Sequence, residues 1–259
     1  MGKLDGKVAV ITGCASGLGK QHALRFANEG ANLAICDILE EKLMETKQLC
    51  EAKGVEVVAM PCDVGRYEDL EAFIKATTDR FGTIDALLNN AHKITPIRPF
   101  LEQQIEDLDV ELHTSLYAIW HLMKLCFPYM KDKPGAGASI INVASSAGVE
   151  GTAMYAAYAA SKEAIRGLSR VVAREWGAHN IRVNTVCPGG WTDNVTERLP
   201  QMNQGVQDMV ERAFKANALQ QIGDPYEDVS PVFVFLASDE SHWITGDNLN
   251  ANGGTWIGP

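Results

Sequence analysis

Two residues four positions apart carry a pattern suited to acid–base chemistry, Tyr158 and Lys162 in the segment YAASK. Residues at i and i+4 share a helical face, so a helix here presents the phenol and the ammonium together. A neighbouring cation favours the phenolate and lowers a pKa that is otherwise about 10. We therefore expect Tyr158 to act as general base on an alcohol or general acid on a ketone. Such pairs are common on helix surfaces, so other residues must support this interpretation.

A hydroxyl stands where it can orient a reacting oxygen. Ser145 lies thirteen residues before Tyr158 and directly follows the apolar run 139–144. The carboxyl ends of strands meet at the ligand crevice of a parallel sheet, and a hydroxyl there can position the substrate. Ser146 is the adjacent alternative. Tyr155, two turns before Lys162, is expected to line the substrate pocket.

A glycine-rich segment, TGCASGLG at 12–19, follows the first apolar run. Between a strand and a helix, such glycines let the backbone approach a pyrophosphate at the helix N-terminus. Asp37 ends the next apolar run, and an acid there accepts hydrogen bonds from the adenosine ribose and repels a 2′-phosphate. Ser16 occupies a position where an arginine would serve NADP. The predicted cofactor is therefore NAD; a helix-capping role is the alternative for Asp37.

Short apolar runs alternate with amphipathic ones along the 259 residues. Strands are predicted at 7–12, 32–37, 55–60, 84–89, 139–144, 181–186 and 248–251. Helices are predicted at 17–29, 40–53, 68–81, 105–130, 155–176 and 226–236. Repeated strand–helix units predict an α/β fold: one Rossmann domain spanning 1–259, a doubly wound parallel sheet of about seven strands with helices on both faces. The long segment 190–215 is predicted to be a substrate lid.

With these residues identified, the chain resembles the short-chain dehydrogenase/reductase family over nearly its whole length. Its motifs match, in chain order, Thr12, Gly13, Gly17 and Gly19; Asp63 and Val64; Asn89, Asn90 and Ala91; Ser145, Tyr158 and Lys162; Pro188 and Gly189; Gly253 and Gly254. From these motifs and the resemblance, the predicted cofactor-binding residues are Gly13, Ala15, Ser16, Gly17, Leu18, Gly19, Asp37, Ile38, Asp63, Val64, Asn90, Ala91, Tyr158, Lys162, Pro188, Gly189, Trp191 and Thr192. The resemblance also implies a homotetramer or homodimer formed through the two long helices.

The chain departs from the family pattern at several positions. His92 replaces a glycine, and it either points into the substrate pocket or is tolerated by the backbone. Ser115 replaces an asparagine that holds a water in a proton relay from the lysine; an extra water or His113 is the alternative means of completing the relay. The family's threonine after the Pro-Gly turn appears one place early, at Thr192, with Asp193 in its usual slot.

The predicted substrate pocket is mostly apolar. Its assigned residues are His92, Ile94, Ser145, Ala147, Tyr155 and Trp191. We therefore expect hydride transfer between NAD and an apolar secondary alcohol or ketone that is cyclic, terpenoid, aromatic or steroid-like, with Ser145, Tyr158, Lys162 and Ser115 as catalytic residues and no metal. The alternatives are a 3-oxoacyl-thioester reductase and a non-catalytic NAD-binding regulatory protein.

Composition restricts the partners. A formal net charge of −10 argues against nucleic acid and anionic membrane surfaces, because phosphate contacts need clustered lysine and arginine. Six cysteines without metal-binding or disulfide-framework spacing indicate buried thiols in a reducing compartment. With neither a signal peptide nor an apolar run of the required ~20 residues, the predicted location is the cytoplasm.

Overall fold

The central strands are short, apolar and buried along their length, as expected for a parallel sheet covered on both faces. In the computed structural model, which describes residues 2–192, 199–201 and 204–257, seven strands form one sheet in the order β3-β2-β1-β4-β5-β6-β7. Every pairing is parallel. The strands are β1 (Val8–Thr12), β2 (Asn32–Asp37), β3 (Val57–Pro61), β4 (Ala86–Asn89), β5 (Ala138–Val143), β6 (Ile181–Pro188) and β7 (Asn248–Ala251).

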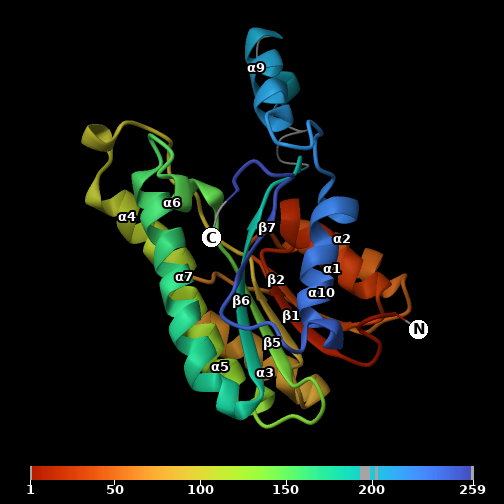
Figure 1. Ribbon diagram of the computed structural model, residues 1–259. Coiled ribbons are helices and arrows are strands. Elements are labelled where there is room, and N and C mark those ends of the chain that lie inside the picture. The colour runs from red at the N-terminus through yellow and green to blue at the C-terminus, as the bar shows by residue number, and fades with distance from the viewer. Residues whose placement is uncertain (1, 193–198, 202–203, 258–259) are drawn as a thin grey trace.

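Helices cover both faces of this sheet (Figure 1). One layer consists of α1 (Gly17–Asn28), α2 (Glu40–Glu51) and α10 (Ser230–Ala237). The opposite layer consists of α3 (Tyr67–Phe81), α5 (Ala118–Met130) and α7 (Ala156–Trp176). Phe26 and Phe233 fill the core on the first side, and Phe73 and Ile165 fill it on the second. The predicted doubly wound Rossmann fold is confirmed.

The helix predicted at 105–130 is continuous but not uniform. It begins as α4 (Ile105–Glu111), passes through the π-helical segment η2 (Leu112–Tyr117) and continues as α5. The Ala118 N–H bonds to the His113 carbonyl, five residues back, which is the π-helical spacing. Such segments are frequent at functional sites, and this one contains Ser115.

Two helices were not predicted. Ser145 caps the short α6 (Ser146–Glu150), and α9 (Gln204–Lys215) lies within the expected lid. Figure 1 shows α9 standing above the strand ends, apart from both helical layers. Residues 193–198 and 202–203 of the predicted lid, Asp193 among them, lie outside the described residues. The remaining short segments are η1 (Phe100–Glu102), η3 (Gly177–His179), η4 (Leu199–Gln201), η5 (Pro225–Val229) and η6 (Asp239–Ser241).

The strand order places the site. β1 lies between β2 and β4, so the chain reverses its direction of travel across the sheet at this point. Ligands of open α/β sheets bind in the crevice outside the carboxyl ends of the strands at such a reversal. Across the described ranges, no helix is both long and apolar enough to cross a membrane.

Candidate active site

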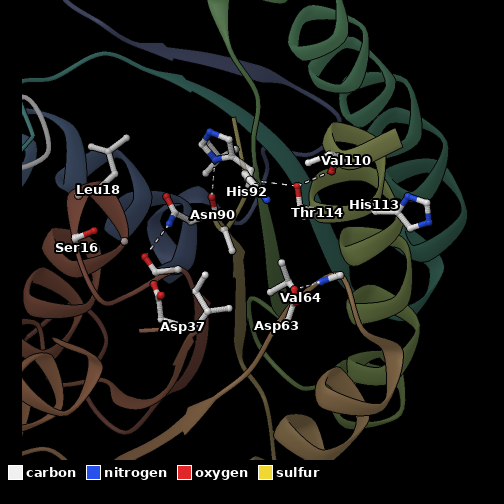
Figure 2. A pocket seen from close by; sticks show the side chains of 18 of the residues that line it. Ser16, Leu18, Asp37, Asp63, Val64, Asn90, His92, Val110, His113 and Thr114 are labelled. Carbon is white, nitrogen blue, oxygen red and sulfur yellow. Dashed lines mark hydrogen bonds between the residues drawn. The ribbon is translucent and has the colours of Figure 1, made fainter. Parts of the chain in front are cut away.

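A cleft of about 860 Å³ opens at the carboxyl ends of the strands. In Figure 2, Ser16 and Leu18 lie on one side of it, Val110 and Thr114 lie on the other, and Asp37 borders it below. Most of the predicted cofactor residues line this cleft, namely Gly13, Ser16, Gly17, Leu18, Gly19, Asp37, Ile38, Asp63, Val64, Asn90, Ala91, Tyr158, Pro188 and Thr192. The cleft lining does not include Ala15, Lys162, Gly189 or Trp191.

The glycine loop is built for close backbone approach. Gly13 and Gly17 have φ angles of 76° and 61°, which favour glycine. A Cβ on Gly19 would lie 1.9 Å from the Gly13 carbonyl oxygen, so no larger residue fits there without a shift. The Ser16 side chain makes no cap hydrogen bond to α1, so it does not compete for the amides of the first turn. These features fit the pyrophosphate of a dinucleotide.

Asp37 is fixed by backbone amides at the end of β2. Its Oδ2 accepts from the Ala15 N–H at 2.9 Å, and its Oδ1 accepts from the Leu39 N–H at 3.1 Å. Ala15 therefore supports the cleft through Asp37 without being part of the lining. The carboxylate is held against the glycine loop, where the adenosine ribose of a dinucleotide would lie.

The loop after β4 is joined to the glycine loop by hydrogen bonds. Thr12 Oγ1 accepts from the amides of Asn90 and Ala91 at 3.1 and 3.0 Å. Asn90 Nδ2 donates to the Thr12 carbonyl at 2.9 Å. On the adjoining wall, Asp63 Oδ1 accepts from the Gly65 N–H at 2.9 Å. The loops after β1 and β4 are therefore fixed to each other, and the loop after β3 lines the same cleft.

Ser145 and Tyr158 meet at the inner end of the cleft. Ser145 follows β5 and caps α6, and Tyr158 lies in the first turn of α7. Burial raises the pKa of Tyr158, while hydrogen bonding with Ser145 lowers it. Between the two serines considered, Ser145 lines the cleft and Ser146 does not.

Lys162 lies one turn further along α7 and is buried, with 1% of its surface exposed. Its Nζ lies 5.5 Å from the centre of the Tyr158 ring and donates to the Val143 carbonyl at 3.0 Å. Burial lowers its pKa to about 8, and the Glu111 charge opposes this. The pKa of Tyr158 lies above its ordinary value, not below it as expected from Lys162, because the effect of burial on the phenol exceeds that of the Ser145 hydrogen bond.

The substrate end is formed by rings and apolar side chains. The His92 ring is 5.8 Å from the Tyr158 ring, centre to centre, and lines the cleft. Its backbone does not have positive φ, so a glycine is not required at this position. Tyr155 packs edge-on against Tyr158 at 6.0 Å and lines a small adjoining pocket with Ile94.

The other predicted substrate residues lie outside both pockets. Ala147 donates its N–H to Ser145 Oγ at 3.2 Å and so helps to orient the Ser145 hydroxyl. Trp191 contacts Phe214 of α9, with ring centres 5.0 Å apart. Neither residue lines the cleft or the small pocket.

Ser115 is buried in the π-helical segment with 1% of its surface exposed. His113, considered as its helper, bonds to the Asp109 carbonyl at 2.8 Å, and its ring points away from the other labelled side chains in Figure 2. Residues two apart in a helix do not share a face, so His113 does not join Ser115.

Sequence reasoning did not identify Glu111, which is fully buried one turn before Ser115. Its Oε1 accepts from the Thr95 N–H at 2.7 Å and from Thr95 Oγ1 at 3.0 Å. The available signal was its spacing, since Glu111 and Ser115 stand at i and i+4 of one predicted helix.

The fold and the site together define the class to which this protein belongs. A cleft at the strand-order reversal, with a glycine loop and an acid at the end of β2, is that of a dinucleotide-binding α/β protein. Residues 13–255 match the model of a family described as enoyl-(acyl carrier protein) reductase. The chain belongs to the short-chain dehydrogenase/reductase family of oxidoreductases.

Individual relatives are similar over their full length. A 12alpha-hydroxysteroid dehydrogenase of Clostridium sp. (strain ATCC 29733 / VPI C48-50) is 37% identical, with 98% of each chain covered. A 3-oxoacyl-[acyl-carrier-protein] reductase of Thermotoga maritima is 35% identical, covering 98% of this chain and all of that one. The structure of carveol dehydrogenase from Mycobacterium avium in complex with NAD superimposes with a TM-score of 0.89 at 31% identity, covering 98% and 99% of the two chains.

Proposed function

We propose that this protein is an NAD-dependent dehydrogenase or reductase of an apolar cyclic secondary alcohol or ketone. The convergence of Ser145 and Tyr158 at the inner end of the dinucleotide cleft, with Lys162 buried behind the phenol, carries this proposal. The similar hydroxysteroid dehydrogenase, and the carveol dehydrogenase solved with NAD, support the substrate class and the cofactor.

Residues of the chain would hold NAD along the cleft. The glycine loop would bind the pyrophosphate, and Asp37 would accept hydrogen bonds from the adenosine ribose. Asp63 and Val64 would flank the adenine, and Thr192 would meet the carboxamide. The nicotinamide, when bound, supplies the hydride acceptor or donor.

The chain's own residues would move the proton. Ser145 Oγ would hold the substrate oxygen in place, and Tyr158 would take the hydroxyl proton in oxidation or return it in reduction. Lys162 would keep positive charge behind the phenol and hold the nicotinamide ribose, with Ser115 serving the relay behind it. His92, Ile94 and Tyr155 would enclose the apolar part of the substrate.

The test is a panel of cyclic and aromatic secondary alcohols with NAD⁺ and NADP⁺, read as reduced nicotinamide absorbance. We expect turnover with a lower KM and a higher kcat for NAD⁺, because the fixed Asp37 carboxylate repels a 2′-phosphate. Preference for NADP⁺ would contradict the cofactor assignment. Cofactor binding without turnover on any substrate would instead support the non-catalytic regulatory alternative.

A second candidate is reduction of a 3-oxoacyl thioester, favoured by the similar reductase of Thermotoga maritima. An acetoacetyl thioester with NADH and NADPH therefore belongs in the same panel. The Asp37 carboxylate argues against this candidate, since biosynthetic reductions commonly use the phosphorylated cofactor. Faster thioester reduction than alcohol oxidation would favour it.

A further inference from the structure

Three buried polar groups lie together where α4, the π-helical segment and α7 pack. Glu111, Ser115 and Lys162 are each at most 1% exposed. Glu111 Oε1 is satisfied by Thr95, but Glu111 Oε2 and Ser115 Oγ have no hydrogen-bond partner within the part of the chain that the structure describes. Leaving such atoms unpaired is destabilising, and more so for a charged group.

The two unsatisfied oxygens are on neighbouring positions of one helical face. Glu111 and Ser115 are four residues apart across the start of the π-helical segment, a spacing that stacks side chains. Both α4 and this segment pack against α7, which carries Lys162. The Glu111 charge acts on Lys162 and on Tyr158, which places its carboxylate within electrostatic reach of the catalytic pair.

We propose that Glu111 is the proton acceptor at the far end of the relay behind Lys162, with the Ser115 hydroxyl and a bridging water between them. Among the described residues, Glu111 and Lys162 form no salt bridge with each other. A proton that moves between them therefore needs a bridging group, such as a water. Buried waters typically bridge polar groups of this kind. Together, the carboxylate and the hydroxyl would take the place of the asparagine amide that the family pattern has at the Ser115 position.

The proton balance in alcohol oxidation is simple. The substrate hydroxyl proton passes to Tyr158, and the hydride leaves with the cofactor of the proposed function, on which this inference rests. Tyr158 passes this proton on toward Lys162, and Lys162 gives one proton through the bridging water and Ser115 to Glu111, so that Tyr158 and Lys162 return to their starting states. The Glu111 carboxylate becomes a carboxyl, which later releases the proton to solvent. In ketone reduction the same proton travels in the opposite direction.

The pKa directions suit this transfer. Burial raises the pKa of Glu111, which the Thr95 donors and the Lys162 charge oppose, and Asp107 raises it further. Burial lowers the pKa of Lys162 to about 8. The donor and the acceptor are thus brought closer in proton affinity, which favours exchange between them. The charged and titratable groups that face Glu111 are Lys162 and Tyr158 of α7 and Asp107 of its own helix.

The test compares Glu111→Gln with Glu106→Gln, the same change at an exposed position of α4. Glutamine keeps an oxygen for Thr95 but cannot accept a proton. We expect kcat for oxidation to fall about tenfold, which is a small part of what general acid–base catalysis contributes. The solvent isotope effect should increase. The acidic limb of the pH profile should move to lower pH, because losing the Glu111 charge lowers the Tyr158 pKa. Glu106→Gln should leave kcat, the solvent isotope effect and the pH profile unchanged.

A rescue variant separates proton relay from structure. Adding Ser115→Asn to Glu111→Gln supplies the missing amide and should restore kcat to within about threefold of the wild type. If Glu111 only anchors the loop at Thr95, the second change will not restore kcat and the solvent isotope effect will stay at the wild-type value; either result would overturn the proposal. Should Glu111→Gln fail to fold, Ser115→Ala tests the same relay, and an unchanged kcat and isotope effect there would also overturn it. A wild-type enzyme without NAD-linked turnover would instead refute the proposed function.

Discussion

At the scale of residues, Tyr158 is the position where a single oxygen decides the chemistry. Its phenol lines the cleft with Ser145, and phenylalanine would preserve its half-buried ring. We expect Tyr158→Phe to lower kcat by at least about 10²-fold, the lower range for loss of a general acid–base. Cofactor binding, measured by quenching of protein fluorescence, should remain.

The matched control is Tyr129→Phe, which removes the same oxygen from a residue of α5 that is 39% exposed. It should retain wild-type turnover. Residual activity in Tyr158→Phe within a few-fold of the wild type would show that another group moves the proton.

Lys162 links the active site to stability. Its pKa is lowered from 10.5 to about 8 by burial, so between those values the unfolded chain holds a proton that the folded chain has released. Stability rises with pH wherever the unfolded state binds more protons. The free energy of unfolding of the wild type, relative to Lys162→Met, should therefore increase from pH 8 toward pH 10, by up to about 1.4 kcal/mol per pH unit.

Urea denaturation at several pH values measures this difference. The window ends near pH 10.5, where the unfolded lysine also releases its proton, and the titration of Tyr158 cancels because both variants contain it. A difference that does not depend on pH between 8 and 10 would show that Lys162 is not titrated by burial.

At the scale of elements, the β1–α1 turn shows how closely the backbone must approach itself. A Cβ on Gly19 would meet the Gly13 oxygen at 1.9 Å and Asn90 Nδ2 at 2.5 Å. We expect Gly19→Ala to destabilise the fold by about 1–3 kcal/mol, as overpacking does, and to weaken cofactor binding. Thermal unfolding with and without NAD measures both effects.

Gly177→Ala is the control for this change. Gly177 has a φ of −56°, and an added Cβ would meet nothing within 4 Å. Its stability should stay equal to that of the wild type or rise by up to about 1 kcal/mol, since alanine restricts the unfolded chain. Equal destabilisation by both variants would mean that the Gly19 contact does not limit the fold.

The elements also show what sequence can predict. The bounds of β2 and β7 match the expectation, because apolar runs flanked by polar residues mark buried strands. The π-helical segment within 112–117 was not predicted, since six residues are too few to separate its spacing from that of the α-helix on either side. Glu111 was missed for a related reason: a charged residue within an amphipathic helix is ordinarily exposed, and its burial depends on Thr95 and α7.

At the scale of the whole molecule, the outer side of the α5–α7 layer carries large exposed apolar side chains. Leu122 and Ile165 face the sheet, whereas Trp120 and Val171 on the same helices are 50% and 54% exposed. Exposed apolar patches of this kind often mark an interface between proteins. We therefore predict a homodimer or homotetramer formed through this layer, with a light-scattering mass that is a multiple of 28.2 kDa.

Trp120→Glu should shift that mass toward a smaller species, because a buried carboxylate without a partner is costly at an interface. The same charge introduced by Leu49→Glu, at a 46% exposed position on α2 in the opposite layer, should leave the mass unchanged. Loss of assembly in both variants would indicate general unfolding, and circular dichroism distinguishes this. A wild-type monomer would contradict this prediction. If Trp120→Glu yields a folded smaller species, its turnover shows whether the α7 face must be covered to hold Tyr158 and Lys162 in place.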